Sequence, residues 1–194
     1  MKLALGNKKL VHDLEGPGLR MAYWFQGCSL RCPGCCNPHL FSFSGGAQVE
    51  VTELIKELKD LKRNKGLQGV SLLGGEPCDQ SESLLMLVKA CKETDLSVML
   101  YSGYSLDELE EDEFRSQVLE YTDLLVCGRF VEEKRELTRR WIGSSNQRLL
   151  FLSDRYDPSD PVFYKSNEVE FKLQKGRIEV TGFPVVNPGE IRPV

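Results

Sequence analysis

Short apolar runs alternate with amphipathic stretches along most of the chain. Five runs have the length and composition of buried strands, at residues 20–26, 69–73, 96–101, 123–127 and 149–152. Three stretches repeat apolar side chains at helical spacing, at residues 51–62, 81–93 and 106–120. Strands that alternate with helices of these lengths predict parallel βαβ units. The pattern therefore indicates an α/β protein with a mainly parallel sheet.

The pattern changes after residue 152. The segment 157–161 (Asp-Pro-Ser-Asp-Pro) interrupts regular structure, and residues 168–181 alternate between apolar and polar side chains around Lys175-Gly176. This alternation predicts a β-hairpin. We therefore expect two units, a core domain over residues 1–152 and a C-terminal extension with the hairpin over residues 153–194.

Composition and charge restrict the partners and the location of the protein. A formal net charge of -4 gives no reason to expect a nucleic acid or an acidic membrane as a partner. No apolar run approaches the roughly 18 residues that span a bilayer. The first residues also turn polar before the apolar region of about 7–15 residues that a signal peptide needs. These features predict a cytoplasmic protein.

The seven cysteines are unevenly distributed, with four of them between positions 28 and 36. Cytosolic thiols stay reduced, so this clustering favours a metal site over disulfides. Cys28, Cys32 and Cys35 lie in a loop that contains glycine and proline, directly after the first predicted strand. Three thiolates can hold three corners of an iron–sulfur cube, which normally takes four cysteines. The fourth iron would then be open to a small molecule.

Zinc is the main alternative for these thiols. Zinc motifs usually combine two separated ligand pairs, and the chain has only His12 and His39 to add to its cysteines. The adjacent Cys36 is the obvious fourth ligand, but neighbouring cysteines must both bend back from one short segment to reach the same cluster. Our hypothesis is that Cys36 lines the site without ligating the cluster, and a buried free thiol is the alternative.

The other conspicuous segments also follow predicted strands. In parallel sheets, ligands bind at the carboxyl ends of the strands. These ends carry the cysteine loop, Gly74-Gly75-Glu76-Pro77, Tyr101-Ser102-Gly103 and Cys127-Gly128-Arg129. The sequence therefore predicts one site that these segments share.

The ordered set of motifs resembles the radical S-adenosylmethionine (SAM) superfamily and, within it, the activating enzymes of glycyl-radical proteins such as anaerobic ribonucleotide reductases. The resemblance extends over roughly residues 10–152 and does not include the predicted hairpin. The segments that carry it are 15–20 (Glu-Gly-Pro-Gly-Leu-Arg), 25–28 (Phe-Gln-Gly-Cys), 32–38 (Cys-Pro-Gly-Cys-Cys-Asn-Pro), 73–77 (Leu-Gly-Gly-Glu-Pro), 101–104 (Tyr-Ser-Gly-Tyr), 125–130 (Leu-Val-Cys-Gly-Arg-Phe) and 143–148 (Gly-Ser-Ser-Asn-Gln-Arg).

The resemblance implies a fold and two cofactors. A full eight-unit barrel would need about 250 residues, and this chain has 194. The implied fold is therefore a partial, incomplete TIM-like barrel of parallel βα units, with the C-terminal β-hairpin as an appendage. The implied ligands of a [4Fe-4S] cluster are Cys28, Cys32 and Cys35. The implied SAM-binding residues are Gly74, Gly75, Glu76, Pro77, Tyr101, Ser102 and Gly103, for which ordinary strand-end turns are the alternative.

Two arginines and one cysteine are further candidates. A guanidinium fork matches a carboxylate, so Arg20 and Arg129 are expected to bind the carboxylate of SAM or a peptide backbone. We treat Arg20 as a candidate SAM-binding residue. A structural ion pair is the alternative for each. Cys127 stands where the resembled family usually has Asp, and a thiol that faces the cluster could donate a hydrogen atom or trap a radical. A small buried hydrophobe is the alternative here. We treat Cys127 and Arg129 as candidate catalytic residues.

The function implied by the resemblance is a radical SAM oxidoreductase. It would cleave SAM reductively to a 5′-deoxyadenosyl radical and activate a glycyl-radical enzyme by hydrogen abstraction. The implied partners are a protein or peptide substrate and an electron donor of the flavodoxin or ferredoxin type. Two alternatives stay open: modification of a peptide or other substrate, and a non-catalytic iron–sulfur electron-transfer protein. The second predicts no SAM binding, and the glycine-rich strand ends argue against it.

Overall fold

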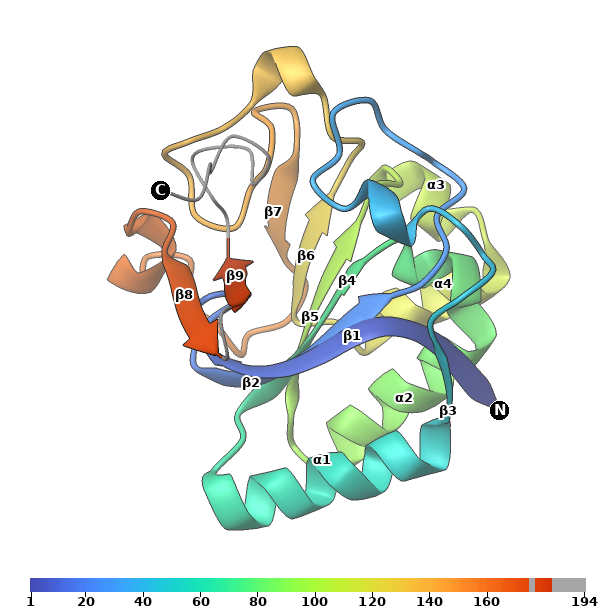
Figure 1. Cartoon of the computed structure of the whole chain (residues 1–194). Coiled ribbons are helices and arrows are strands. Elements are labelled where there is room, and N and C mark those ends of the chain that lie inside the picture. The colour runs from blue at the N-terminus through green and yellow to red at the C-terminus, as the bar shows by residue number, and fades with distance from the viewer. Residues whose placement is uncertain (175–176, 183–194) are drawn as a thin grey trace.

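The computed structural model describes residues 1–174 and 177–182 (Figure 1). The main body is a seven-stranded sheet in the order β3-β1-β2-β4-β5-β6-β7. Its strands are β1 (Lys2–His12), β2 (Leu19–Phe25), β3 (Ala47–Glu50), β4 (Gly69–Gly74), β5 (Ser97–Ser102), β6 (Leu124–Cys127) and β7 (Arg148–Phe151). The helices of the described residues are α1 (Val51–Lys65), α2 (Ser81–Glu93), α3 (Leu106–Glu110) and α4 (Glu113–Glu120).

The centre of the sheet is parallel and its edges are antiparallel. Strands β2, β4, β5 and β6 pair in parallel, which confirms the predicted α/β class with a mostly parallel sheet. Strand β7 was expected and runs antiparallel to β6; the connection between them contains a short 3-10 helix and no α-helix that could return the chain for parallel pairing. Strands β1 and β3 form the other antiparallel edge. They were not predicted, because β1 contains charged residues and a glycine and β3 has only four residues, so neither has a clear buried pattern.

The predicted helices are present, but one of them is divided. Helix α2 has the expected bounds, and α1 ends at Gly66, whose φ of 69° is left-handed. The stretch expected as one helix over residues 106–120 contains α3 and α4 instead. The Asp112 side chain accepts hydrogen bonds from the backbone nitrogens of Phe114 and Arg115. A new helix therefore begins at this cap.

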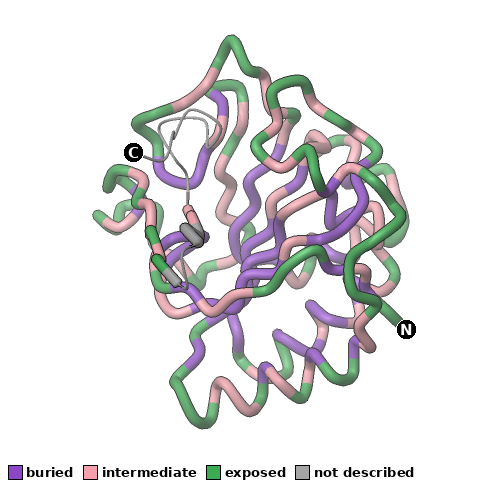
Figure 2. Tube along the Cα trace, in the orientation of Figure 1, coloured by how far each residue is buried: buried purple, intermediate pink, exposed green. Residues whose placement is uncertain are grey.

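The helices cover one face of the sheet, and a second core lies on the other face (Figures 1 and 2). Side chains alternate along each strand, so Val126 faces the second core while Cys127 belongs to the helix-side core. Phe163 lies in the second core with Trp141 and Tyr156, and its ring packs edge-on against both. The expected extension from residue 153 therefore contributes to the core of the body.

A separate two-stranded sheet follows, formed by β8 (Val169–Gln174) and β9 (Arg177–Gly182). The two strands pair antiparallel, with Phe171 opposite Val180. This confirms the predicted hairpin strands, and the expected turn at Lys175-Gly176 lies outside the described residues. In the part of the chain that is described, no helix combines the length and apolar character needed to cross a bilayer.

Candidate functional site

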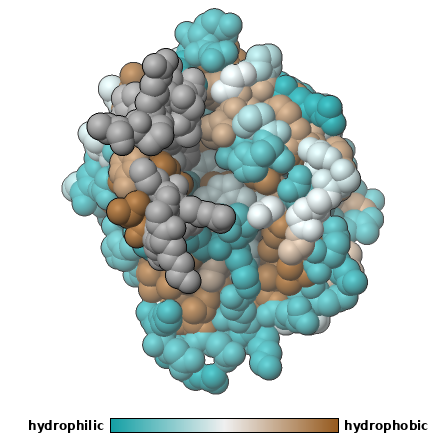
Figure 3. All heavy atoms as spheres, viewed as in Figure 1, coloured by the Kyte–Doolittle hydropathy of each residue, from teal (hydrophilic) through white to brown (hydrophobic). Residues whose placement is uncertain are grey.

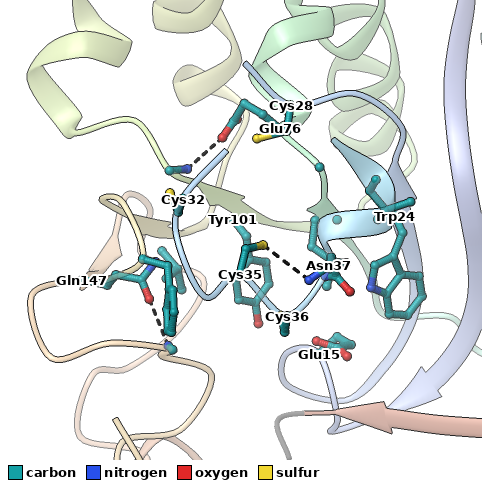
Figure 4. A pocket seen from close by; sticks show the side chains of 18 of the residues that line it. Glu15, Trp24, Cys28, Cys32, Cys35, Cys36, Asn37, Glu76, Tyr101 and Gln147 are labelled. Atoms are coloured by element: carbon teal, nitrogen blue, oxygen red, sulfur yellow. Dashed lines mark hydrogen bonds between the residues drawn. The ribbon is translucent and has the colours of Figure 1, made fainter. Parts of the chain in front are cut away.

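A cavity of about 410 Å³ lies at the carboxyl ends of the parallel strands (Figure 4). The surface in the orientation of Figure 1 is hollowed near its centre (Figure 3). Trp24, Leu73, Tyr101 and Val126 contribute to the cavity from the ends of β2, β4, β5 and β6. The cysteine loop forms another part of its lining. The sequence segments that were expected to share one site therefore meet mostly here.

The loop after β2 brings three thiols to the cavity. Cys28, Cys32 and Cys35 all line it, with Cys28 buried and the other two partly exposed. Two glycines in left-handed conformations bend the loop, Gly27 at a φ of 94° and Gly34 at 69°. A Cβ atom at Gly34 would meet the flexible end of the Glu132 side chain, so the left-handed φ is what favours glycine at this position.

Three thiols around one cavity are a donor set that suits an iron–sulfur cluster. Among residues 1–174 and 177–182, no three His, Cys, Asp or Glu side chains are grouped as a single metal ion would need. A [4Fe-4S] cube separates its cysteine ligands onto different corners, so three thiols around one cavity suit it. Hydrogen bonds from the Cys36 thiol and from the Asn37 backbone nitrogen lower the pKa of the Cys35 thiol. They therefore favour the thiolate, which is the ligand form.

Cys36 also lines the cavity. It follows Cys35 and lies on the part of the loop that approaches Glu15 (Figure 4). This position is compatible with our hypothesis that Cys36 lines the site without acting as a ligand, which stays a prediction.

The two glycines after β4 join that strand to the cysteine loop. The backbone nitrogen of Gly75 donates to the carbonyl of Phe25 at 2.8 Å. A Cβ atom at Gly75 would collide with the carbonyl of Gly27. Gly74 has a φ of 109°, a conformation that favours glycine. Both glycines line the cavity, so their backbone is close to the thiols and accessible to a bound molecule.

Glu76 connects the ends of β4 and β5. Its buried carboxylate accepts hydrogen bonds from the backbone nitrogen of Gly103 at 2.8 Å, from the Ser102 hydroxyl at 2.9 Å and from the backbone nitrogen of Cys78 at 2.9 Å. Burial raises the pKa of Glu76 to about 7, although these hydrogen bonds oppose the shift. Glu76, Tyr101, Ser102 and Gly103 all line the cavity, whereas Pro77 is absent from its lining.

Arg20 lies below the cavity and does not line it. Its side chain is 0% exposed, and its guanidinium donates to the hydroxyls of Ser71 and Ser97 at 2.8 and 2.7 Å. It also donates to the carbonyl of Val70 and to three other oxygens nearby. The expected contact with the SAM carboxylate is corrected, because these neutral oxygens already surround the guanidinium.

The two candidate catalytic residues also lie outside the cavity lining. Cys127 packs in the helix-side core. This corrects the expectation that the thiol faces the cluster. Arg129 forms a two-bond ion pair with Glu108, with both contacts at 2.8 Å. The alternative of a structural ion pair therefore describes its observed contacts.

Sequence reasoning did not single out Glu15 as a site residue, although it begins one of the quoted motifs. Glu15 lines the cavity and is buried, and burial raises the pKa of its carboxyl group to about 8. The backbone nitrogen of Gly182 donates to it at 3.2 Å. An acidic residue before a Gly-Pro-Gly turn is a weak signal by itself, and the contact with Gly182 joins residues too far apart in sequence to predict.

Comparisons with known proteins agree with the cavity chemistry. The 4Fe-4S single cluster domain family matches residues 14–150. An anaerobic ribonucleoside-triphosphate reductase-activating protein from Haemophilus influenzae is 34% identical over 141 residues, which cover 69% of this chain and 88% of that protein. The protein of the same name from Vibrio cholerae is 35% identical, with 71% and 90% covered. A pyruvate formate-lyase-activating enzyme from Clostridium pasteurianum is 36% identical, with 60% and 50% covered.

Proposed function

Since the chain belongs to the 4Fe-4S single cluster domain family and to the radical SAM activating enzymes of glycyl-radical proteins, we propose that it generates a glycyl radical on a partner enzyme. It would do so by reductive cleavage of SAM at a [4Fe-4S] cluster, followed by removal of a hydrogen atom from a glycine. The reductase-activating relatives make an anaerobic ribonucleotide reductase the first candidate partner.

One observation carries this proposal. The three thiols of the cysteine loop line the same cavity as Gly74, Gly75 and Gly103. A cluster ligand set and an exposed glycine backbone at parallel strand ends are the two parts that SAM chemistry at a cluster requires. A protein that only transfers electrons needs the first part alone.

The residues that line the cavity would have separate roles in this reaction. Cys28, Cys32 and Cys35 would hold the cluster, and one iron would remain for the amino and carboxylate groups of SAM. When bound, the reduced cluster supplies the electron that splits a C–S bond of SAM into methionine and the 5′-deoxyadenosyl radical. Gly74 and Gly75 would present backbone groups to the methionyl end, and their lack of a side chain lets that backbone pack against Phe25 and Gly27. Glu76 keeps Ser102 and Gly103 in position through its hydrogen bonds.

The same lining would protect a reactive intermediate. Leu30, Leu40 and Leu73 surround the cavity with apolar side chains, which exclude water from the site. The sheet is open, since among the described strands its edges β3 and β7 do not pair with each other. We interpret it as an incomplete barrel. A lateral opening suits a macromolecular substrate, because a loop of the partner can enter from the side.

The decisive experiment is anaerobic reconstitution followed by reduction in the presence of SAM. We expect 5′-deoxyadenosine and methionine in equal amounts, and a glycyl-radical signal by electron paramagnetic resonance when the anaerobic ribonucleotide reductase of the same genome is added. Iron binding without SAM cleavage would instead support an electron-transfer protein. SAM cleavage without a radical on the reductase would favour modification of another peptide or protein. A flavodoxin or ferredoxin is the expected electron donor and can replace the chemical reductant.

A further inference from the structure

The hairpin β8–β9 is attached to the body through its polar face. The Lys9 ammonium group donates to the Thr181 hydroxyl at 2.6 Å and pairs with the Glu170 carboxylate at 3.0 Å. Glu170 and Thr181 stand opposite each other on the two strands, so they share one face of the hairpin. Gly182 adds the hydrogen bond to Glu15 described above. These contacts fix which side of the hairpin points toward the body.

The opposite face of the hairpin is apolar and exposed. Phe171 pairs with Val180, and Leu173 follows two residues after Phe171, so the three side chains share this face. Phe171 is 59% exposed and Leu173 is 76% exposed. Hydrophobic atoms are visible over β8 on the surface in Figure 3. A hairpin usually buries its apolar face against the core, so the reversed orientation of this one indicates a binding surface.

The apolar face continues into the cavity. Val180 belongs to both, because it lines the cavity and stands beside Phe171. Thr181 and Gly182, which follow Val180 in β9, also line the cavity, so β9 forms one wall of it. Leu137, which is 49% exposed, also lines the cavity and comes from a separate loop. A polypeptide segment that enters the cavity past this wall would therefore contact apolar side chains at the rim.

We propose that Phe171, Leu173 and Val180 form a docking face for the apolar residues that flank the target glycine of the protein substrate. The proposal rests on the proposed function, because it assumes that a polypeptide segment must reach the cavity. The matched family region ends at residue 150, before the hairpin. The docking face therefore lies outside the part of the chain that the family model matches.

The test uses two fluorescent heptapeptides with a central glycine as probes, one with apolar residues and one with aspartates on both sides of it. Binding to the reconstituted enzyme with SAM is measured by fluorescence anisotropy. The wild type is expected to bind the apolar peptide more tightly. The double variant F171S/L173S is expected to bind it about tenfold more weakly, a change of about 1.4 kcal/mol, because it loses two apolar side chains from the docking face.

Phe114→Ser is the matched control, because it removes an exposed phenylalanine from α4 on the helix-covered side. We expect this variant to keep the preference of the wild type. Equal binding of the two peptides by the wild type, or an unchanged preference in F171S/L173S, would overturn the proposal. A dimer in sedimentation that dissociates in the double variant would also overturn it, since a second copy would then cover the face. SAM cleavage without peptide is assayed separately and tests the proposed function alone.

Discussion

The carboxylate of Asp79 holds Ser29, the residue that follows the first cysteine of the loop. It accepts hydrogen bonds from the backbone nitrogen of Ser29 at 2.7 Å and from its hydroxyl at 3.0 Å. The hydroxyl of Tyr104 donates to the same carboxylate at 2.8 Å, and the Arg115 guanidinium stacks on the Tyr104 ring at 3.9 Å. One end of the cysteine loop is therefore tied to the segments that follow β4 and β5.

Loss of the hydrogen bonds between Ser29 and Asp79 should weaken retention of the cluster. In Asp79→Ala the Ser29 nitrogen and hydroxyl lose the carboxylate. Tyr104→Phe removes the hydrogen bond to Asp79 and the contact of 3.0 Å with the Ser29 hydroxyl. Because hydrogen bonds to charged groups contribute about 1.5–3 kcal/mol, Asp79→Ala should lose iron to a chelator on the order of tenfold faster. Tyr104→Phe should have a smaller effect. The decay of cluster absorbance after addition of the chelator measures both rates.

Tyr164→Phe is the matched control for this series. Its hydroxyl donates to the carbonyl of Pro158 at 3.1 Å, and Tyr164 is not part of the cavity lining. Its iron should be lost at the rate of the wild type. Equal rates in Asp79→Ala and the wild type would show that the loop is held by other contacts, such as the hydrogen bond from the Cys28 nitrogen to Phe41.

Replacement of Arg20 by Met should destabilise the fold. The change removes the guanidinium that donates hydrogen bonds to the buried hydroxyls of Ser71 and Ser97. A buried polar group that is left without a partner costs about 1–3 kcal/mol. The free energy of unfolding in urea should fall by about 3 kcal/mol. The control Arg63→Met lies on the surface of α1, paired with Asp60, and should change it by less than about 0.5 kcal/mol. A stable Arg20→Met protein with weakened SAM binding would instead restore the carboxylate-binding role.

Glu15 should make the fold less stable as the pH rises. Its pKa is raised from 4.5 to about 8 in the folded state. Between these values the folded state keeps a proton that the unfolded state releases, so stability falls by up to about 1.4 kcal/mol per pH unit. Glu76, with a pKa of about 7, acts in the same direction over a narrower range. Urea unfolding at pH 5.5 and 7.5 measures how far the free energy of unfolding falls between these values. The fall should be smaller in Glu15→Gln than in the wild type, and an equal fall in both proteins would contradict the raised pKa of Glu15.

Helices and strands with a clear periodic or apolar pattern over a few consecutive residues were predicted from the sequence. Helix α2 and strand β4 are periodic or uniformly apolar, so their positions follow from the sequence. The division between α3 and α4 depends on one competing cap at Asp112. Strand β1 was missed because several of its residues are charged and its partners, β2 and β3, supply much of what holds it.

The sequence could not predict which face of the sheet each side chain of the central strands occupies. Strands such as β6 are buried on both sides, so hydrophobic side chains occur at every position and give no alternation. Sequence reasoning therefore placed Cys127 at the correct strand end and on the wrong face. The same limit applied to Arg20, whose polar partners come from β4 and β5. The cysteine loop was different, because the spacing of its cysteines is enough to predict a metal site. That prediction does not depend on which face of the sheet a side chain lies on.

The two adjacent cysteines should behave differently after anaerobic reconstitution. Cys35→Ala should lose most of the iron per chain, because it removes one of three proposed ligands. Cys36→Ala should keep an iron content near that of the wild type and an unchanged cluster absorbance. The two variants differ by one position in the same loop, so each controls for general damage to it. Loss of iron in Cys36→Ala would identify Cys36 as a ligand and would overturn our hypothesis.

Cys127 should contribute to stability and not to radical chemistry. Its sulfur packs between the sheet and the helices, and burial raises the pKa of this thiol, which keeps it neutral. Cys127→Ala removes a small buried side chain, so the free energy of unfolding should fall by about 1 kcal/mol. The rate of 5′-deoxyadenosine formation and the yield of glycyl radical should stay within about twofold of the wild type. A variant that still cleaves SAM but gives no glycyl radical would show that the thiol takes part in hydrogen transfer. The helices would then have to move during turnover, since the observed packing keeps Cys127 out of the cavity.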